Sequence, residues 1–366
     1  MKILLTGGGT GGHIMPILAV VDKLRKLKDG KVEFLFVGPK SNFNQVIKNK
    51  GINVKVINAG KLRRYISIEN IFDLIKFPVG IIQSLFTIYN FKPNIVFSKG
   101  GYASVPPVVG AWIFQIPIIT HESDVVPGLA NRIISKFASK IFVSFSDSEK
   151  YFAFNKVVYA GNPIREEILN GNKERAKNVF DLKDNIPTVL VFGGSQGAVK
   201  INEVVLKSLS DLLEKVQIIH ICGEKNYEEI KSKIKKIKLK RISRYKVYPF
   251  LTDNLKDAYA LSEIVISRAG ANSLSEIIAA EKQSIIIPLP TSANNHQYKN
   301  AEYFFEKGLL TIIKEENLNP DVLIKQLFKL LQEDGFGANM KSRIRKYNSN
   351  ITNSAELLAK EIINFK

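Results

Sequence analysis

The chain has 366 residues, of which 45% are hydrophobic, and a formal net charge of +19. This length exceeds the usual span of one hydrophobic core and predicts two domains. The single cysteine, Cys222, excludes an intramolecular disulfide and fits a reducing compartment such as the cytoplasm. No secretory signal is expected at the N-terminus, and the most apolar segment, residues 66–89, is too polar for a spanning helix.

The positive charge is uneven. Residues 1–160 carry 21 Lys and Arg against 9 Asp and Glu, whereas the rest carries 32 against 25. Nucleic acid, anionic lipid and an acidic small substrate would each attract such a surface. A nucleic-acid role would rest on charge alone, because the sequence has no basic motif interleaved with aromatic residues; no nucleic-acid partner is expected.

The first predicted element is a short apolar strand over residues 2–6. It runs into a loop with five glycines at positions 7–9, 11 and 12, followed by His13 and a helix over residues 14–27. Glycine lets the backbone approach a ligand, and the start of a helix presents free N–H groups and a positive dipole end. The pattern is typical of a diphosphate site, although a tight strand-to-helix turn remains the alternative.

Further strands and helices alternate along the chain. The predicted strands cover residues 32–38, 54–57, 94–98, 117–121 and 140–144, then 188–192, 217–220, 245–249, 264–267 and 284–288. The pattern breaks near residues 158–165 and restarts at 187. We therefore predict an α/β protein with two Rossmann-like, doubly wound parallel-sheet domains, residues 1–162 and 163–338. Residues 339–366 are expected to form a helical tail that can pack back on the N-terminal domain.

Two more glycine turns follow predicted strands, at Gly100-Gly101 in Ser98-Lys99-Gly100-Gly101-Tyr102 and at Gly193-Gly194. None of the three is a phosphate loop of the Walker type, because no Gly-Lys-Ser/Thr follows. A nicotinamide dehydrogenase also fits poorly, since its second strand would end in an acidic residue, whereas this one ends Val37-Gly38-Pro39-Lys40.

A carboxylate appears later, at Glu276, in the predicted first turn of the helix after strand 264–267. Two roles fit its spacing. Ser273 and Glu276 match a capping box, in which the glutamate bonds back to its own helix start. The carboxylate could equally accept hydrogen bonds from the two hydroxyls of a ribose.

Seven motifs follow one another along residues 3 to about 308. They are Gly8-Gly9-Thr10-Gly11-Gly12-His13, Gly100-Gly101-Tyr102-Ala103-Ser104, His121-Glu122-Ser123, Gly161-Asn162-Pro163-Ile164-Arg165, Gly193-Gly194-Ser195-Gln196-Gly197-Ala198, Arg268-Ala269-Gly270-Ala271 with Ser275-Glu276, and Gln297-Tyr298-Lys299-Asn300-Ala301. In this order they resemble the motifs of the MurG family, the UDP-N-acetylglucosamine:lipid I transferases of bacterial cell-wall synthesis.

The resemblance implies a GT-B glycosyltransferase, with two Rossmann-like domains facing across a cleft. It would transfer N-acetylglucosamine from UDP-GlcNAc to the C4 hydroxyl of the muramyl sugar of lipid I, with inversion, giving lipid II for peptidoglycan synthesis. It implies no cofactor or metal, and the sequence shows no dense cluster of metal-ligand residues. Other cell-wall synthesis proteins are expected as partners.

The resemblance also implies site residues. Ser195 would contact phosphate, Arg165 and Gln297 the donor, Leu251 the uracil, and Glu276 the ribose hydroxyls. The same donor pocket would be lined by Ala271, Asn272, Ser273, Leu274, Ser275 and Glu276. Thr10, Gly11, Gly12 and Asp124 match positions at the donor sugar, and Gly9, Gly100, Gly101 and Tyr102 belong to loops expected at the acceptor and its diphosphate. Asp124 stands where some members carry asparagine, and an ionised aspartate cannot donate a hydrogen bond.

The acceptor hydroxyl must lose a proton to a general base. His13 is the first candidate, since a histidine ordinarily titrates near pH 6.5. A histidine that only bonds phosphate or backbone is the alternative, and Glu122 and Asp124 are rival bases. His121 is expected to orient other groups, His220 to be a buried strand histidine, and His296 to lie beside the donor site.

An apolar stretch in the basic N-terminal half has two interpretations. It comprises Ile71, Phe72, Ile75, Phe77, Ile81, Ile82, Leu85 and Phe86, with Trp112, near Lys61, Arg63, Arg64 and Lys76. An apolar patch ringed by cations suits peripheral binding to an anionic membrane, here at its cytoplasmic face. For residues at strict helical spacing, a stripe that faces the core is the favoured interpretation. Residues 231–241, with seven basic side chains, are expected to be a solvated helix face.

Three other functions remain open. Another GT-B enzyme could use a UDP sugar on a different glycolipid. A two-lobed solute-binding protein could close on a nucleotide sugar without turnover, but the missing export signal argues against it. The remaining role, nucleic-acid binding, lacks a motif.

Overall fold

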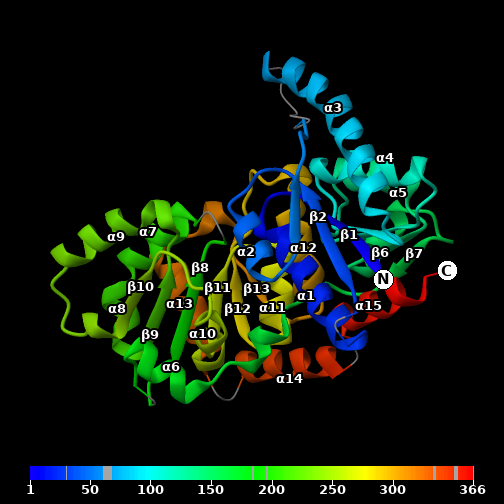
Figure 1. Cartoon of the computed structure of the whole chain (residues 1–366). Coiled ribbons are helices and arrows are strands. Elements are labelled where there is room, and N and C mark those ends of the chain that lie inside the picture. Colours follow the sequence, from blue (N-terminus) through cyan, green and yellow to red (C-terminus); the bar gives the residue numbers. More distant parts are fainter. Residues whose placement is uncertain are drawn as a thin grey trace. The chain divides into compact units, whose positions relative to one another are not determined.

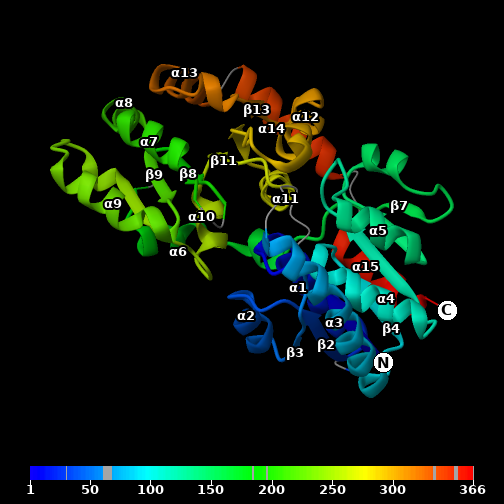
Figure 2. The same ribbon diagram turned by 90° about the horizontal axis from the view of Figure 1, so that it is seen from above.

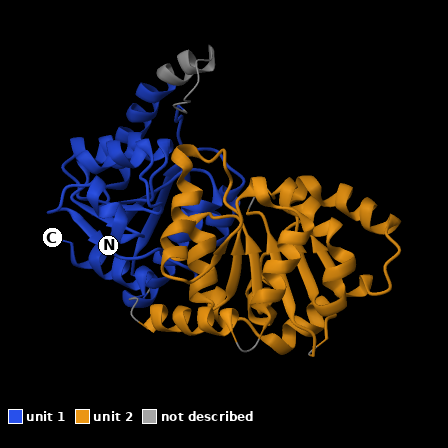
Figure 3. Ribbon diagram, turned by 180° about the vertical axis from the view of Figure 1, so that it is seen from behind, with its two compact units in different colours: residues 1–165, 352–366 blue, residues 166–351 orange. Residues whose placement is uncertain are grey.

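The computed structural model describes residues 1–29, 31–60, 68–183, 185–194, 197–332, 335–349 and 353–365, with the side chains of residues 68–75 left out. The chain divides into two compact units (Figure 3). Unit 1 comprises residues 1–165 and 352–366, and unit 2 comprises residues 166–351.

Unit 1 is a parallel sheet with helices on both faces (Figure 1). Its strand order is β3-β2-β1-β4-β5-β6-β7, and every neighbouring pair is parallel. The elements are β1 (Lys2–Thr6), α1 (Gly11–Leu27), β2 (Glu33–Gly38), α2 (Phe43–Asn49), β3 (Asn53–Val56), α3 (Ile68–Phe91), β4 (Ile95–Ser98), the 3-10 turn η1 (Tyr102–Ser104), α4 (Val105–Ile113), β5 (Ile118–Glu122), α5 (Leu129–Phe137), β6 (Lys140–Val143), η2 (Ser146–Tyr151), β7 (Val157–Tyr159) and α15 (Ser354–Asn364).

Unit 2 repeats this plan with six parallel strands in the order β10-β9-β8-β11-β12-β13. In Figure 2, β8, β9 and β11 lie between α7, α8 and α13 on one side and α6 and α10 on the other. The elements are η3 (Glu166–Asn170), α6 (Lys173–Phe180), β8 (Thr188–Phe192), α7 (Val199–Lys207), α8 (Leu209–Lys215), β9 (Gln217–Ile221), α9 (Glu224–Lys236), η4 (Ile242–Arg244), β10 (Tyr245–Tyr248), α10 (Leu255–Leu261), β11 (Ile264–Ser267), α11 (Ala271–Ala279), β12 (Gln283–Ile286), η5 (Ala293–Asn295), α12 (His296–Glu306), β13 (Thr311–Ile312), η6 (Glu315–Asn317), α13 (Pro320–Leu330) and α14 (Phe336–Ser349).

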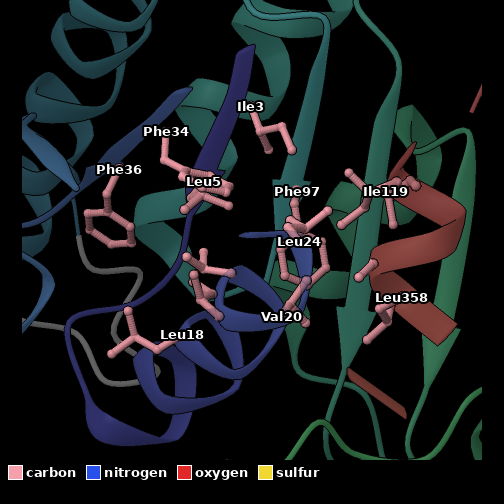
Figure 4. Packing of buried hydrophobic residues seen from close by; sticks show 14 of the residues in the cluster. Ile3, Leu5, Leu18, Val20, Leu24, Phe34, Phe36, Phe97, Ile119 and Leu358 are labelled. Atoms are coloured by element: carbon pink, nitrogen blue, oxygen red, sulfur yellow. The ribbon is translucent and has the colours of Figure 1, made fainter. Parts of the chain in front are cut away.

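Alternation along the strands builds two cores in unit 1. Ile3 and Leu5 of β1 point to the face covered by α1 and α15, where they meet Phe97 and Leu358 (Figure 4). Leu4, between them in sequence, points to the opposite face, which α3, α4 and α5 cover. Both faces of the central strands are therefore largely apolar, which explains the near-continuous hydrophobic runs that predicted a covered parallel sheet.

The two-sheet α/β architecture predicted from these runs is confirmed. Two short strands, β7 and β13, were not predicted. β7 has three residues and lies where the pattern breaks, and β13 has only two. Elements this short are below the length at which periodicity is visible.

The expected helical tail over residues 339–366 is divided between the units. Helix α14 begins earlier, at Phe336, and contacts α11 and α13 in unit 2. Helix α15 packs on α1 and places Leu358, Ala359 and Ile362 in the core of unit 1. The boundary in the middle of the chain falls after Arg165.

Candidate functional site

The loops that carry the glycine motifs of unit 1 meet at the reversal of strand order. β1 and β4 are neighbours, and the chain leaves them toward β2 on one side and β5 on the other. Doubly wound sheets bind ligands at the carboxyl ends of strands at such a point. Here the amide of Gly8 donates to the carbonyl of Gly100 at 3.0 Å, which ties the first glycine loop to the second.

The ring of His13 lies against the backbone of Gly8 and Gly101, where a side chain on either residue would stand. A Cβ on Gly8 would lie 2.7 Å from Nδ1 of His13, and a Cβ on Gly101 would lie 3.2 Å from its Nε2. Gly101 also has a φ of +87°, a region that other residues rarely adopt. Glycine is thus required at both positions, because the two backbones sandwich the imidazole.

His13 stands in the first turn of α1, three residues after Thr10. Its Nδ1 lies 3.0 Å from Oγ1 of Thr10. The pKa of His13 is lowered to about 4, mainly by burial and also by the nearby Lys99 ammonium, while Asp124 acts in the opposite direction. At neutral pH the imidazole is therefore uncharged and can accept a proton.

Glu122, at the end of β5, is held by its own loop. Its Oε1 accepts from the amide of Asp124 at 2.9 Å, and its Oε2 accepts from the amide of Gly128 at 3.2 Å and from Nδ2 of Asn131 at 2.8 Å. Burial raises the pKa of the carboxyl, as does the neighbouring Asp124. Two donors from its own loop and one from α5 fit a carboxylate that shapes residues 122–128.

A polar network continues behind this loop. The Lys99 ammonium donates to the Ser123 hydroxyl, and Oδ1 of Asn162 accepts from Ser123 at 3.4 Å and from Ser144 at 3.3 Å. Nε2 of His121 lies 2.9 Å from the carbonyl of Gly161 and must donate to it. The motif that contains Asn162 and Arg165 is thereby joined to the β5 loop.

The carboxyl edge of unit 2 has an equivalent reversal between β8 and β11. After β8 the chain turns tightly: Gly194 and Gly197 have φ values of +85° and +75°, and a Cβ on Gly197 would lie 2.5 Å from the carbonyl oxygen of Cys222. Ser195, predicted to contact phosphate, lies outside the described residues together with Gln196.

Helix α11 begins at Ala271, with Gly270 as its N-cap. Ser273 is therefore the third helical residue and Glu276 the sixth, so the predicted placement of Glu276 in the first turn is wrong. The capping box is wrong as well, because Ser273 does not occupy the N-cap position that this motif requires. Asn272, Ser273, Ser275 and Glu276 are half-buried, whereas Ala271 and Leu274 face the core.

Gln297 fixes the start of α12 to the loop that follows β12. Its Oε1 accepts from the amide of Leu289 at 3.0 Å, and its own amide donates to Oγ of Ser292 at 3.3 Å. Leu251, after β10, is buried. These residues lie in loops and helix starts at the carboxyl ends of the unit 2 strands, where a doubly wound sheet binds ligands.

Most of the remaining predicted site residues lie in loops and helix starts that follow the strands. Thr10, Gly11 and Gly12 begin α1, Gly100, Gly101 and Tyr102 lead into η1, Asp124 lies in the β5 loop, and Arg165 ends the first part of unit 1. His220 is a buried β9 histidine, as predicted, between Tyr245 and Asn202. His296 is the first residue of α12.

Sequence reasoning assigned no role to Lys99, which is only 2% exposed beside His13 and Glu122. Residue type and spacing carry no signal of this burial, because the groups around Lys99 come from α1 and β5, elsewhere in the chain. Asn131 was also missed: it lies nine residues beyond Glu122 and meets it only through the turn of α5.

The apolar stretch on α3 is divided between core and surface. Ser84 and Ile88 are buried, and Phe77, Ile81 and Leu85 are half-buried. Ile82 and Phe86 are 53% and 68% exposed, so the core-facing interpretation is wrong for these two. Ile71, Phe72 and Ile75, and the cations Lys61, Arg63 and Arg64, lie outside the described side chains.

Two kinds of feature are absent from the residues that the structure describes. No group of three His, Cys, Asp or Glu side chains is placed to hold a metal ion in the part of the chain that the structure describes. In the same residues, no helix has both the length and the apolar character needed to cross a bilayer.

Two family models match the chain. Residues 3–143 match the glycosyltransferase family 28 N-terminal domain, and residues 188–362 match the glycosyltransferase family 28 C-terminal domain. The two matches are the N-terminal and C-terminal domains of one family.

Curated relatives match over nearly the whole length. A Clostridium botulinum protein is 39% identical over 98% of this chain and 99% of its own, and a Bacillus cereus protein is 38% identical over 95% of each. Both are named UDP-N-acetylglucosamine–N-acetylmuramyl-(pentapeptide) pyrophosphoryl-undecaprenol N-acetylglucosamine transferase, the second with the number 2.

Solved structures share the fold. The MurG crystal structure from Acinetobacter baumannii aligns with a TM-score of 0.74 at 24% identity, covering 100% of this chain and 99% of that one. A UDP-GlcNAc 2-epimerase from Neisseria meningitidis aligns at 0.68 with 14% identity, covering 99% and 98%. The two-unit fold is thus shared by enzymes with different names.

Proposed function

This chain belongs to glycosyltransferase family 28, within the UDP-N-acetylglucosamine–N-acetylmuramyl-(pentapeptide) pyrophosphoryl-undecaprenol N-acetylglucosamine transferases, and we propose that it transfers N-acetylglucosamine from UDP-GlcNAc to the C4 hydroxyl of the muramyl sugar of lipid I. The product is lipid II, for peptidoglycan synthesis. The observation that carries the proposal is the identity of 37–39% across both units to relatives with this name.

The donor belongs to unit 2 in this proposal. Glu276 accepts hydrogen bonds from the ribose hydroxyls, which is supported by its position one turn inside α11, where it does not cap its own helix. Leu251 flanks the uracil, Ser195 contacts phosphate, and Gln297 and Arg165 contact the donor. Gln297 offers its side-chain NH2 group, since its carbonyl oxygen already accepts from Leu289. Ala271, Asn272, Ser273, Leu274 and Ser275 line the same pocket.

The acceptor belongs to unit 1. Gly9, Gly100, Gly101 and Tyr102 lie in the loops that take its diphosphate, while Thr10, Gly11, Gly12 and Asp124 lie at the transferred sugar. The positive dipole end of α1 and the close approach of glycine backbone to His13 support this assignment, because both favour an anion.

Inverting transfer is a single displacement. The acceptor oxygen attacks the anomeric carbon of N-acetylglucosamine, the bond from that carbon to the β-phosphate oxygen breaks, and UDP leaves with its electron pair. In the tautomer whose Nδ1–H donates a hydrogen bond to Oγ1 of Thr10, Nε2 of His13 is unprotonated and takes the hydroxyl proton. The anomeric centre becomes oxocarbenium-like, and helix N-termini stabilise the charge that gathers on UDP.

His13 is favoured over Glu122 because the Glu122 carboxylate already accepts three hydrogen bonds. A base must have a lone pair directed at its substrate, and those of Glu122 are directed at its own loop. Asp124 remains the rival base.

The transferase works as a peripheral protein on the cytoplasmic face of the membrane that holds lipid I. Ile82, Phe86 and Tyr89 recur at helical spacing on the outer face of α3, which packs against α4, and Trp112 at the end of α4 is 56% exposed. Lys76 is exposed on the same helix. Exposed apolar side chains beside a cation suit an anionic lipid surface.

The activity test supplies UDP-GlcNAc and a lipid I analogue and follows UDP release together with the disaccharide product. We expect UDP release only when the acceptor is present. A UDP sugar inverted at C2, formed without acceptor, would instead indicate an epimerase, and donor binding without turnover would contradict both enzymes.

The membrane test compares sedimentation with vesicles of anionic and of neutral lipid. The double variant I82S/F86S should lose binding to anionic vesicles, whereas F154S should retain it. Phe154 is 96% exposed in unit 1 but lies between η2 and β7, away from α3 and α4 in the sequence. Equal loss in both variants would contradict the α3 surface.

A further inference from the structure

Lys99 is a buried cation that the proposed transfer does not use. Lys99 is 2% exposed, and it directly follows strand β4, whose four residues are all buried. Burying an ammonium is costly unless it is paired and hydrogen-bonded. Here the Lys99 ammonium donates to the Ser123 hydroxyl, and Glu122 and Asp124 lie near enough to interact with its charge. The proposed transfer does not explain why this charge is kept beside the glycine loops.

The position of Lys99 is set on both sides. Its amide donates to the carbonyl of Thr6 at 2.8 Å, so the β1–β4 pairing continues to this residue. At the other end, its ammonium donates to the Ser123 hydroxyl. The side chain therefore lies across the sheet edge, from the β4 end to the β5 loop.

Lys99 and His13 flank the same glycine. A Cβ on Gly7 would lie 3.4 Å from Cβ of His13 and 3.7 Å from Cβ of Lys99. Both side chains leave the backbone at this point, one from the first turn of α1 and one from the end of β4. The ammonium is near enough to His13 for a charge interaction.

The charged groups around this pair come from three elements. Lys99, at the end of β4, faces Glu122 and Asp124 from the β5 edge. His13, on α1, faces Lys99 and Asp124. His121, on β5, faces Lys99, and its Nδ1 has no hydrogen-bond partner among the described residues. Two histidines thus face one ammonium, while two carboxylates offset it.

We propose that Lys99 is a positioning residue for the transfer: its buried ammonium, anchored by Ser123 and placed with His13 around Gly7, adds to burial in disfavouring a positive charge on the His13 imidazole. Lys99 touches neither substrate, since its side chain is buried and its ammonium bonds to protein. The inference deepens the proposed function because it concerns the base of the same site.

The charge state of Lys99 at neutral pH supports this role. Burial lowers the pKa of Lys99 to about 8, with Glu122 and Asp124 opposing that effect, so the ammonium keeps its proton at neutral pH. A like charge beside a titrating group disfavours its charged form. With the ammonium removed, His13 would face the carboxylate of Asp124 alone and would protonate more readily.

The first experiment titrates the histidine rings by NMR, with selective carbon-13 labelling of the four histidines and assignment of His13 through H13Q. In K99Q, which keeps a donor for Ser123 but loses the charge, we expect the His13 titration to move up by about one pH unit or more. K99R keeps the charge and should leave it low. K136M removes an exposed lysine of α5 and is the matched control.

An unchanged His13 titration in K99Q would overturn the proposal, as would an equal shift in K99R or K136M. Should K99Q fail to fold, K99M and S123A provide the same comparison, because the first removes the charge and the second removes its anchor. Circular dichroism and thermal unfolding identify the folded variants before titration.

Activity provides the second readout. For K99Q we expect the acid limb of kcat/KM to move upward with the His13 titration, giving about a tenfold loss for each pH unit below it. The NMR result does not depend on turnover, so absence of transferase activity in all variants would contradict the proposed function alone. A shifted His13 with an unmoved acid limb would remove His13 as the base and leave the charge effect of Lys99 standing.

Discussion

Nδ1 of His13 and Oγ1 of Thr10 lie 3.0 Å apart, and this contact determines which ring nitrogen can act as a base. When Nδ1 carries the proton and donates to the hydroxyl, Nε2 is left as the acceptor. Nε2 is the atom next to Gly101, at the loop expected to meet the acceptor. A threonine at the N-cap position, with no capping hydrogen bond of its own, therefore orients the candidate base.

Replacing Thr10 tests this orientation. Thr10→Val keeps the shape but loses the hydroxyl, and we expect kcat to fall about tenfold, the equivalent of one hydrogen bond of about 1.4 kcal/mol. Thr10→Ser, which retains the hydroxyl, should stay near wild-type activity. Steady-state kinetics decide the matter, and wild-type turnover in Thr10→Val would remove Thr10 as the orienting group.

Glu276 and Ser273 separate ligand binding from helix capping. Because Gly270 is the N-cap of α11, Ser273→Ala should leave the thermal midpoint within about 2 °C of wild type, whereas loss of a true cap costs about 1 kcal/mol. Glu276→Ala should raise KM for UDP-GlcNAc at least about tenfold. Parallel thermal melts and donor kinetics give both results; a large loss of stability with unchanged KM would contradict the ribose role.

Glu122→Gln tests the loop-shaping role of this carboxylate. Glutamine has one acceptor oxygen and an NH2 group, so at least one of the amides of Asp124 and Gly128 would face a donor. We expect a loss of about 1–3 kcal/mol in the free energy of unfolding, because a buried donor is left unsatisfied. Chemical denaturation measures it. If Glu122 were the general base and did not stabilise the loop, Glu122→Gln would instead lose activity while its free energy of unfolding stayed at the wild-type value.

The pH dependence of stability follows from buried neutral histidines. Burial lowers the pKa of His220 to about 3, whereas an unfolded histidine titrates near 6.5. Between pH 6.5 and about 3 the His220 ring therefore binds a proton in the unfolded chain but not in the folded chain. The contribution of His220 to the free energy of unfolding is complete above pH 6.5 and is lost as the pH drops toward 3. The loss is about 1.4 kcal/mol per pH unit for this residue.

His220→Gln removes that titrating group. Denaturation midpoints at pH 7, 6 and 5 should fall less steeply in the variant than in wild type, even though the variant starts less stable through lost contacts with Tyr245 and Asn202. Parallel curves would show that His220 does not contribute. His13, with its pKa lowered to about 4, adds to the slope that remains.

Much of the fold could be predicted, because covered parallel strands are apolar on both faces and stand out as unbroken apolar runs such as residues 189–192. The order of the strands could not be read in the same way, since it depends on which sheet edge each helix returns to. This order brings Gly8 beside Gly100, which lies far away in the sequence.

The candidate site could be predicted at its glycines and at His13, where residue type and spacing are informative. The helix start at α11 was missed because Ser273 is a better N-cap by type than Gly270, and only backbone geometry shows which one takes the position. Lys99 was passed over because a lysine in sequence gives no sign of burial. Its environment comes from β5 and α1, which lie elsewhere in the chain.

Helix α15 has a consequence for the order of synthesis. It is the last helix of the chain, yet its Leu358, Ala359 and Ile362 complete the core built on α1, the first. A ribosome has made all of unit 2 before it delivers these side chains, so the domain that starts first cannot close first. Until then the part of this core that α15 covers stays exposed, and unit 1 departs from the usual expectation that N-terminal domains complete folding first during synthesis.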